Sequence, residues 1–270
     1  MMLLLVRVES TNQSGLRQRS FLICRNALLL LVYRNPTSPF IISSFQMQIF
    51  LDTADTQVIQ NGYNTGLVDG ITTNPTLIMK SGRNPEIVYQ ELIDMGFTDV
   101  SMEVVGNRKE MYEEGNRLAS KFGKSATIKV PCTPDGLAVC KELSRKLIKV
   151  NVTLIFSPSQ AILSAKAGAK YVSPFVGRVD DNSFDGLSLI RDISNIYTKQ
   201  QVFKTEILAA SIRSVADVSK AFEYGAHICT IPPSVFDKMY KHVLTDAGLA
   251  QFDKDWENVK SKVQSLREGT

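Results

Sequence analysis

The sequence has few of the residues from which metal centres and disulfide frameworks are built. Its 270 residues include two histidines and four cysteines. The cysteines, Cys24, Cys132, Cys140 and Cys229, form no C-x-x-C pair, so the sequence indicates neither a zinc site nor a set of disulfides. Scattered free thiols are typical of a reducing compartment, and we therefore expect a cytoplasmic protein.

Long hydrophobic runs and an excess charge on the folded body are also missing. Two apolar runs, 3–6 and 27–33, fall well short of the ~20 residues that cross a membrane, so no membrane span is predicted. The net charge of +4 arises within residues 1–46, where five arginines accompany one acidic residue, Glu9. The remaining residues carry 26 basic and 26 acidic side chains, since the totals are 31 and 27. A neutral body gives no electrostatic reason to expect nucleic acid as a partner.

Residues 1–46 differ in composition from the rest and are predicted to lie outside the folded domain. They are rich in Arg and Ser and poor in acids, as organelle transit peptides are. The alternative, which we favour, is that Met47 is the true start and that the segment is not normally made. In both cases we expect 1–46 to be disordered or loosely placed, and 47–270 to form the functional domain.

From residue 48 onward, short β-branched runs alternate with longer helical patterns. Strands are predicted over 48–52, 68–72, 100–105, 126–130, 150–155, 170–173, 202–208 and 226–230. Helices are predicted near 55–64, 84–96, 108–122, 135–146, 158–167, 184–198, 214–224 and 233–242. Eight such units in about 200 residues predict a closed (β/α)8 TIM barrel. The alternative is a doubly wound open sheet, but no Gly-rich dinucleotide loop follows the first strand.

An additional amphipathic segment, 246–266, follows the eighth unit and contains the only tryptophan, Trp256. We expect it to form a helix outside the barrel repeat. Such a helix must bury its apolar face, either on the barrel or on a neighbouring subunit.

Polar side chains recur where the predicted strands end. In a TIM barrel the C-terminal ends of the strands form the mouth that holds the active site. The residues near these ends are Asp52, Asn74, Glu103, Lys129, Asn151, Thr153, Ser173, Phe175, Arg178, Ser211 and Arg213. We therefore expect these residues to converge on one site.

Lys129 gives the sharpest indication of chemistry. It lies between Ile128 and Val130 in the middle of a strand predicted to be buried. Burial disfavours the charged ammonium, and a neutral amine is the form that attacks a carbonyl group. The alternative is a structural ion pair between Lys129 and Asp52 or Glu103.

Two carboxylates and two guanidiniums complete the set of charged candidates. Asp52 and Glu103 are available for proton transfer, although Asp52 could instead cap a helix and Glu103 could form a strand-end salt bridge. Arg178 and Arg213 follow the sixth and seventh strands, in the quarter where barrels often bind phosphate, but they could also be rim charges. His227 is interpreted as a core histidine.

Several segments resemble, in order and spacing, those of the small transaldolases of the class I transaldolase/fructose-6-phosphate aldolase family. The matching segments are Phe-Leu-Asp52-Thr-Ala, Gly70-Ile-Thr-Thr-Asn-Pro-Thr76, Ile-Lys129-Val-Pro, Asn-Val-Thr153-Leu-Ile-Phe and Ser173-Pro-Phe-Val-Gly-Arg178. The resemblance covers residues 47 to about 260 and has several motifs in register, so it is highly specific.

The resemblance implies a mechanism that needs no metal and no cofactor. Lys129 would form an imine with a ketose phosphate, and Asp52 would take the proton from its C4 hydroxyl. Glu103 and Thr153 would hold and activate the water of imine formation and hydrolysis. The family's substrate-binding roles would fall to Asn74, Ser173, Phe175, Arg178, Ser211 and Arg213. Sugar phosphates would be the partners, together with further copies of the chain in a ring, by resemblance a decamer.

Two positions distinguish the branches of this family. The aldolase branch has glutamine where Glu103 stands and tyrosine where Phe175 stands. The sequence therefore favours transfer of a dihydroxyacetone unit over release of free dihydroxyacetone, which stays the alternative. A catalytically inactive barrel is a further alternative, but Lys129, Asp52 and Glu103 are all present. A deoxyribose-phosphate type of aldolase would be expected to place a second lysine beside Lys129, and no candidate is apparent.

Overall fold

The computed structural model describes residues 5–11, 17–25, 28–31 and 47–268, with side chains described for 47–264. The chain divides into two compact units, Met1–Phe45 and Gln46–Thr270. In the first unit β1 (Leu5–Thr11), β2 (Arg17–Arg25) and β3 (Leu28–Leu31) form an antiparallel sheet in that order. The other residues of the predicted extension 1–46 lie outside the described part of the chain. The prediction that this extension does not belong to the functional domain stays a prediction.

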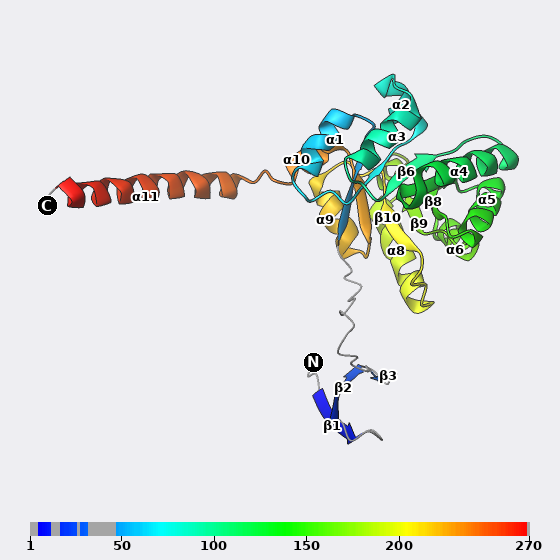
Figure 1. Ribbon diagram of the computed structural model, residues 1–270, viewed down its shortest axis with the longest axis horizontal. Helices are drawn as coiled ribbons and strands as arrows, with labels where there is room; N and C mark the ends of the chain where they lie inside the picture. Colours follow the sequence, from blue (N-terminus) through cyan, green and yellow to red (C-terminus); the bar gives the residue numbers. More distant parts are fainter. Residues whose placement is uncertain (1–4, 12–16, 26–27, 32–46, 269–270) are drawn as a thin grey trace. The chain divides into compact units, whose positions relative to one another are not determined.

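The second unit is a closed barrel of parallel strands in sequential order (Figure 1). The strands are β4 (Gln48–Asp52), β5 (Gly70–Thr72), β6 (Val100–Glu103), β7 (Ala126–Pro131), β8 (Lys149–Ile155), β9 (Tyr171–Pro174), β10 (Glu206–Ala209) and β11 (Ile228–Ile231). The last strand, β11, pairs with β4 and closes the barrel. The predicted (β/α)8 TIM barrel is confirmed, and the open-sheet alternative is wrong.

Helices connect successive strands and cover the outside of the barrel (Figure 1). They are α1 (Thr56–Tyr63), α3 (Pro85–Asp94), α4 (Arg108–Phe122), α5 (Pro134–Arg145), α6 (Pro158–Ala167), α8 (Gly186–Lys199), α9 (Val215–Glu223) and α10 (Pro233–Lys238). Two short helices were not predicted: α2 (Pro75–Ser81) follows β5, and α7 (Val176–Asp180) follows β9. The predicted additional C-terminal helix is present as α11 (Val243–Glu268).

Short polar residues begin many of these helices. The side chains of Asp55, Thr133, Ser157 and Ser214 each accept a hydrogen bond from a backbone N–H group in the first turn of the following helix. At the other end of α6, Gly168 adopts a left-handed conformation with φ 91° and leads the chain into β9. The starts of these helices and the end of α6 therefore have a local physical basis.

The strands are apolar because helices cover the barrel outside and side chains fill its inside. Ile128, Val130, Val150 and Val152 are fully buried in β7 and β8. Lys129 lies in the same stretch and is itself 5% exposed. An ionisable side chain is rarely buried in this way, so the burial of Lys129 indicates a chemical role inside the barrel.

The strand β8 contains an irregularity close to its C-terminal end. Its pairing with β9 shifts register between Val152 and Ile155, and Leu154 has a positive φ of 60°. Bulges of this kind re-aim side chains and are common beside active sites. Here Thr153 and Leu154 are the re-aimed residues, and both face the mouth of the barrel.

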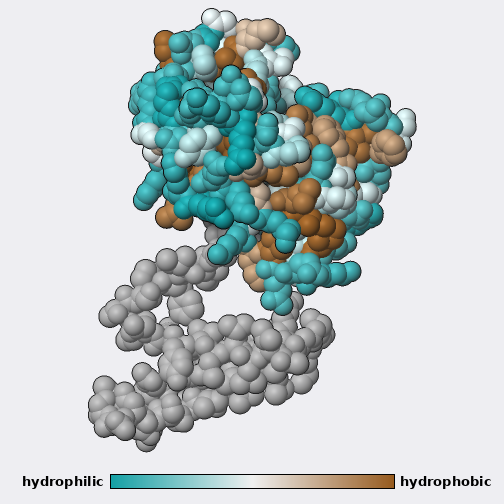
Figure 2. Space-filling model, turned by 90° about the vertical axis from the view of Figure 1, so that its right-hand side faces the viewer, coloured by the Kyte–Doolittle hydropathy of each residue, from teal (hydrophilic) through white to brown (hydrophobic). Residues whose placement is uncertain are grey.

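The surface of the barrel is mainly polar. Figure 2 shows a largely hydrophilic face interrupted by small apolar patches. Within the described part of the chain, no helix combines the length and the apolar character needed to cross a membrane.

Candidate active site

A cavity of about 280 Å³ opens at the C-terminal ends of the barrel strands, and each of the eight strands contributes to its lining. The predicted site residues that line it are Asp52, Asn74, Glu103, Lys129, Asn151, Thr153, Ser173, Phe175, Arg178 and Ser211. Arg213 is the one predicted site residue that does not line the cavity. The sequence therefore predicted which side chains gather, with one exception.

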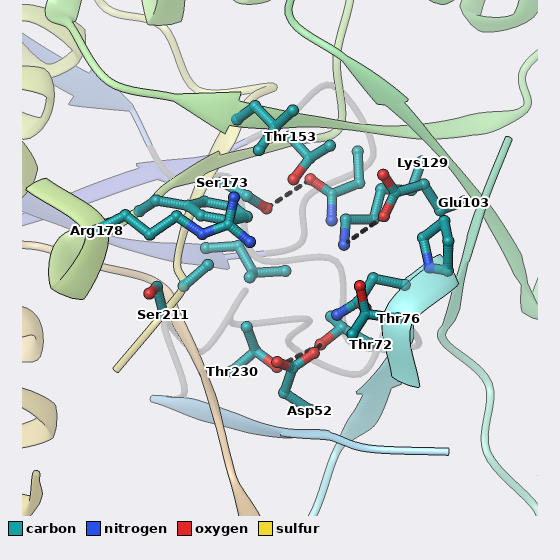
Figure 3. A pocket seen from close by; sticks show the side chains of 17 residues that line it. Asp52, Thr72, Thr76, Glu103, Lys129, Thr153, Ser173, Arg178, Ser211 and Thr230 are labelled. Carbon is teal, nitrogen blue, oxygen red and sulfur yellow. Dashed lines mark hydrogen bonds and ion pairs between the residues drawn. The ribbon is translucent and has the colours of Figure 1, made fainter. Parts of the chain in front are cut away.

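Lys129 projects from β7 into this cavity. Its Nζ lies 3.0 Å from Glu103 Oε2 and donates a hydrogen bond to the Thr73 carbonyl oxygen at 3.1 Å. Figure 3 shows Lys129 and Glu103 together on one side of the cavity. The ion pair that the sequence left open as an alternative is therefore present. It does not exclude a nucleophile, because Glu103 is placed to accept the proton that Lys129 must lose.

Asp52 ends β4 on another side of the cavity (Figure 3). Thr72 Oγ1 donates to Asp52 Oδ1 at 2.7 Å and lies 2.6 Å from Thr230 Oγ1. Because the single hydroxyl proton of Thr72 goes to Asp52, Thr230 is the donor in the second bond. The helix-capping role that the sequence allowed for Asp52 is taken by Asp55. Asp52 is thus free of a structural duty at the helix start.

The pKa of Asp52 is raised from its ordinary value of 3.8, and burial is the main cause. The hydrogen bond from Thr72 and the positive charges of Lys129 and Arg178 act in the opposite direction. A carboxylate held in this balance is suited to accept a proton and to return it.

A buried hydrogen-bonded chain orients the polar groups of β8 and β9. Ser173 Oγ donates to Asn151 Oδ1 at 2.7 Å, and Asn151 Nδ2 donates to Ser101 Oγ at 3.4 Å. All three side chains are fully or almost fully buried. This arrangement fixes the direction of the Asn151 amide and holds Ser173 at the cavity wall.

Thr153 has an unused hydrogen-bonding group. Its Oγ1 is buried and has no hydrogen-bond partner among the described residues. Buried hydroxyls are rarely left unpaired, so this atom is suited to bind a molecule in the cavity. The bulge in β8 places it there, next to Leu154.

Asn74 both caps a helix and faces the cavity. Its side chain caps α2 by accepting a hydrogen bond from the Leu77 N–H at 3.0 Å, and the residue also lines the cavity. The cap fixes the amide oxygen, so the orientation of the amide N–H groups is fixed as well.

Arg178 and Ser211 lie on the same side of the cavity (Figure 3). The Arg178 guanidinium stands 4.8 Å from the centroid of the Phe175 ring, a cation–π contact that holds it in place. Ser211 has a positive φ of 58°, an uncommon conformation for a residue with a side chain. A cation and a hydroxyl at this position are suited to an anionic group.

The structure holds Arg213 outside the cavity. Its guanidinium forms two hydrogen bonds with the carboxylate of Asp181, and both side chains are about half exposed. The prediction that Arg213 binds phosphate therefore stays a prediction, because binding there would require Arg213 to leave Asp181.

The sequence of this chain matches one family over most of the barrel. The model of the family described as transaldolase/fructose-6-phosphate aldolase matches residues 49–263. The chain belongs to this family. It is therefore an enzyme of the transaldolase family, as the five motifs predicted.

Curated relatives agree with this assignment. A "Probable transaldolase" of Nitrosopumilus maritimus is 51% identical over 222 residues, which are 82% of this chain and 100% of that protein. Another of Caulobacter vibrioides is 53% identical over 211 residues, 78% of this chain and 96% of that protein. A third, of Paracoccus denitrificans, is 50% identical over 80% of this chain and 100% of that protein.

One solved structure supports the fold alone. A mutant flavocytochrome b2 with benzoylformate superposes with a TM-score of 0.51, at 14% identity, over 70% of this chain and 57% of that one. Identity at this level carries no information on chemistry.

In this transaldolase-family enzyme, sequence reasoning gave no role to several cavity residues. They are Thr72, Pro75, Thr76, Leu154, Leu208, Ala210 and Thr230. A signal existed for Thr230, which is a polar residue inside the buried apolar strand β11, as Lys129 is inside β7. His227, interpreted as a core histidine, lies half buried outside the cavity, where its Nδ1 accepts from Ile207 N–H at 3.0 Å.

Among the residues that the structure describes, no group of three or more His, Cys, Asp or Glu side chains is arranged to hold a metal ion.

Proposed function

We propose that this enzyme is a transaldolase of the pentose phosphate pathway that works through a Schiff base at Lys129. It transfers a dihydroxyacetone unit from sedoheptulose 7-phosphate or fructose 6-phosphate to glyceraldehyde 3-phosphate or erythrose 4-phosphate. The observation that carries this proposal is a buried lysine, 3.0 Å from a carboxylate, inside a cavity with a second carboxylate, Asp52. Family membership supports the same chemistry.

Imine formation begins with a proton transfer. Glu103, 3.0 Å from Nζ, accepts a proton from Lys129, and the neutral amine attacks the C2 carbonyl of the ketose. The attacking nitrogen passes a second proton to the C2 oxygen, Glu103 returns the first one to the same oxygen, and this oxygen leaves as water while the protonated imine forms. The unpaired Thr153 hydroxyl supports the proposal because it is available to hold that water.

Carbon–carbon cleavage uses the second carboxylate. Asp52 accepts the proton of the C4 hydroxyl, the C3–C4 bond breaks, and its electron pair moves into the enamine on Lys129. An aldose phosphate leaves. The enamine then attacks the aldehyde of the acceptor, Asp52 returns its proton to the new hydroxyl, and water hydrolyses the imine. The protonated imine serves as the electron sink.

Substrate binding follows from the remaining lining groups. Asn74 and Ser173 bind the hydroxyls of the three-carbon unit, and Arg178 and Ser211 bind the phosphate. The guanidinium is suited to phosphate because it presents a planar set of donors. Arg213 adds to this site when it leaves Asp181.

Transfer is favoured over release of free dihydroxyacetone. Phe175 lines the cavity beside Arg178 and offers no hydroxyl to protonate the enamine. Glu103 is a carboxylate that exchanges protons reversibly. The alternative activity, fructose-6-phosphate aldolase, is expected to be minor and to rise in a Phe175→Tyr variant.

The cysteines support a cytoplasmic location as part of this proposal. Cys132, Cys140 and Cys229 are free thiols, as expected in a reducing compartment.

The proposal is tested by measuring transfer and cleavage separately. With fructose 6-phosphate and erythrose 4-phosphate, wild-type enzyme should form sedoheptulose 7-phosphate, and Lys129→Met should lose this activity by at least about 100-fold. Lys149→Arg is a matched control, since Lys149 pairs with Asp99, the residue before β6, and does not line the cavity. If free dihydroxyacetone forms without acceptor as fast as product forms with it, the enzyme is an aldolase instead.

A further inference from the structure

The ion pair between Arg213 and Asp181 lies beside the catalytic cavity. Arg213 comes two residues after Ser211, which lines the cavity. Its Nη1 and Nη2 donate to the two carboxylate oxygens of Asp181, a bidentate arrangement that is the strongest for these groups. Asp181 therefore uses both of its oxygens to hold Arg213.

A glycine makes room for this ion pair. A Cβ atom at Gly177 would lie 2.6 Å from Arg213 Nε and 3.0 Å from Arg213 Cδ. The arginine side chain therefore crosses α7 where no side chain stands. The residue after Gly177 is Arg178, whose guanidinium lines the cavity. Arg213 thus packs on the backbone of the residue next to Arg178, and its half-exposed side chain is free to rotate.

The surroundings of Arg213 are acidic. Asp181 raises the pKa of Arg213 most, and Asp180 and Asp217 act in the same direction. Two of these carboxylates have structural partners: Asp180 accepts from the Gly186 N–H, and Asp217 accepts from the Ser214 N–H in the capping box of α9. The carboxylate of Asp181 accepts its hydrogen bonds from Arg213. It is the group that a substrate phosphate would have to replace.

We infer that Asp181 sets the affinity of the enzyme for phosphorylated sugars by competing with their phosphate for Arg213. This inference rests on the proposed function. An enzyme molecule can bind phosphate with both Arg178 and Arg213 only when Arg213 has left Asp181. The apparent dissociation constant for the sugar phosphate therefore equals the constant of this released form divided by the fraction of molecules in that form. Half-exposed ion pairs change such equilibria by up to about five-fold. Asp181 is therefore a specificity-determining residue that touches no substrate atom.

Binding is measured apart from chemistry in the full-length Lys129→Met protein, which cannot form an imine. Phosphorus NMR titration gives the dissociation constant of fructose 6-phosphate, and proton NMR gives that of unphosphorylated fructose. Asp181→Asn is compared with Glu142→Gln. Glu142 is a control because its partly exposed carboxylate also pairs with an arginine, Arg108, while neither residue lines the cavity.

Asp181→Asn should tighten fructose 6-phosphate binding by about five-fold and leave fructose binding unchanged. The Glu142 control should change either constant by less than two-fold, within the range expected for a remote surface charge. In an Arg213→Gln background the gain from Asp181→Asn should disappear, because the two residues act through each other.

Three results would overturn the inference. Equal fructose 6-phosphate affinity with and without Asp181 would show that no competition exists. An equal gain in the Arg213→Gln background would show that Asp181 repels phosphate directly. An equal gain for fructose would show that phosphate is not involved. If fructose 6-phosphate binds to none of the variants and the wild type shows no transfer, both the proposed function and the inference fail. If the wild type shows transfer but Asp181→Asn leaves the affinity for fructose 6-phosphate unchanged, only the inference fails.

Discussion

Asp52 illustrates how a single residue can favour function over stability. Burial raises its pKa, so the carboxylate that the proposed proton transfer needs is costly to keep ionised in the folded state. The unfolded chain ionises this group at lower pH than the folded chain does. The free energy of unfolding therefore falls as the pH rises from the pKa of Asp52 in the unfolded chain to its higher pKa in the folded chain. Above the folded-state pKa, the full cost of burying the carboxylate remains.

Asp52→Asn should separate these two effects. We expect kcat for transfer to fall by at least about 100-fold, because the general base is lost. We also expect the melting temperature at neutral pH to rise by a few degrees, because a neutral amide still accepts the Thr72 hydrogen bond without the charge. Calorimetry and a transfer assay on the same preparation check both outcomes. A variant that is less stable and inactive would indicate a structural role for Asp52.

Thr72 should control the ionisation of Asp52. Removal of its hydroxyl in Thr72→Val deletes the hydrogen bond that lowers the pKa of Asp52, so that pKa rises further. The acid limb of the kcat/KM profile should then move to higher pH, because activity needs the carboxylate. Thr127→Val is the control, since Thr127 donates to Asp99 at 2.8 Å outside the cavity. A profile equally displaced in both variants would argue against the assignment of Asp52 as the base.

At this scale the sequence predicted residues with strong chemical signatures and missed those that act through hydrogen bonds. Lys129 was identifiable because an amine in an apolar strand is rare. Thr72 and Thr230 are ordinary strand residues, and their bond joins positions 158 residues apart, which no local pattern reports. Arg213 was placed in the site because it follows the seventh predicted strand, but the partner that holds it, Asp181, is set by tertiary structure.

At the scale of elements, α11 has an apolar stripe that needs a partner. Leu249, Phe252, Trp256, Val259 and Val263 recur at alternating spacings of three and four residues, and each is at least 43% exposed. Such a stripe is the seam of a helix that packs against another surface. This supports the proposal, so far a prediction, that the enzyme forms homo-oligomers.

Replacing Phe252 and Trp256 together by glutamate should therefore dissociate the oligomer. We expect a decrease in mass by sedimentation equilibrium, with the circular dichroism of the barrel unchanged. Lys254→Glu changes the charge of the same helix between these two positions and should leave the mass as it is. If wild type sediments as a monomer, the stripe has another function and the oligomer prediction is wrong.

Elements were predictable where a periodic pattern or a cap extends over several residues. The predicted strand 48–52 coincides with β4, and the predicted helix 108–122 with α4. The five-residue α7 is too short for any helical period to appear, and α2 continues directly from a strand end. The bulge at Leu154 was also unpredictable, since its positive φ is imposed by pairing with β9.

At the scale of the whole molecule, the barrel is predicted to need none of residues 1–46. The family match begins at residue 49, and β4 begins at Gln48. A chain that starts at Met47 should show the same melting temperature and transfer activity as the full chain. Differential scanning calorimetry and the transfer assay check this. A truncated chain that fails to fold would show that the extension belongs to the domain.

The central claim concerns one amine in the barrel interior, and chemical trapping tests it most directly. Wild-type enzyme is reduced with sodium borohydride in the presence of fructose 6-phosphate, digested, and mapped by mass spectrometry. The account predicts a stable adduct, larger than the peptide by a reduced sugar-derived unit, on Lys129 alone. An adduct on any other lysine, or none while carbon–carbon transfer proceeds, would contradict it.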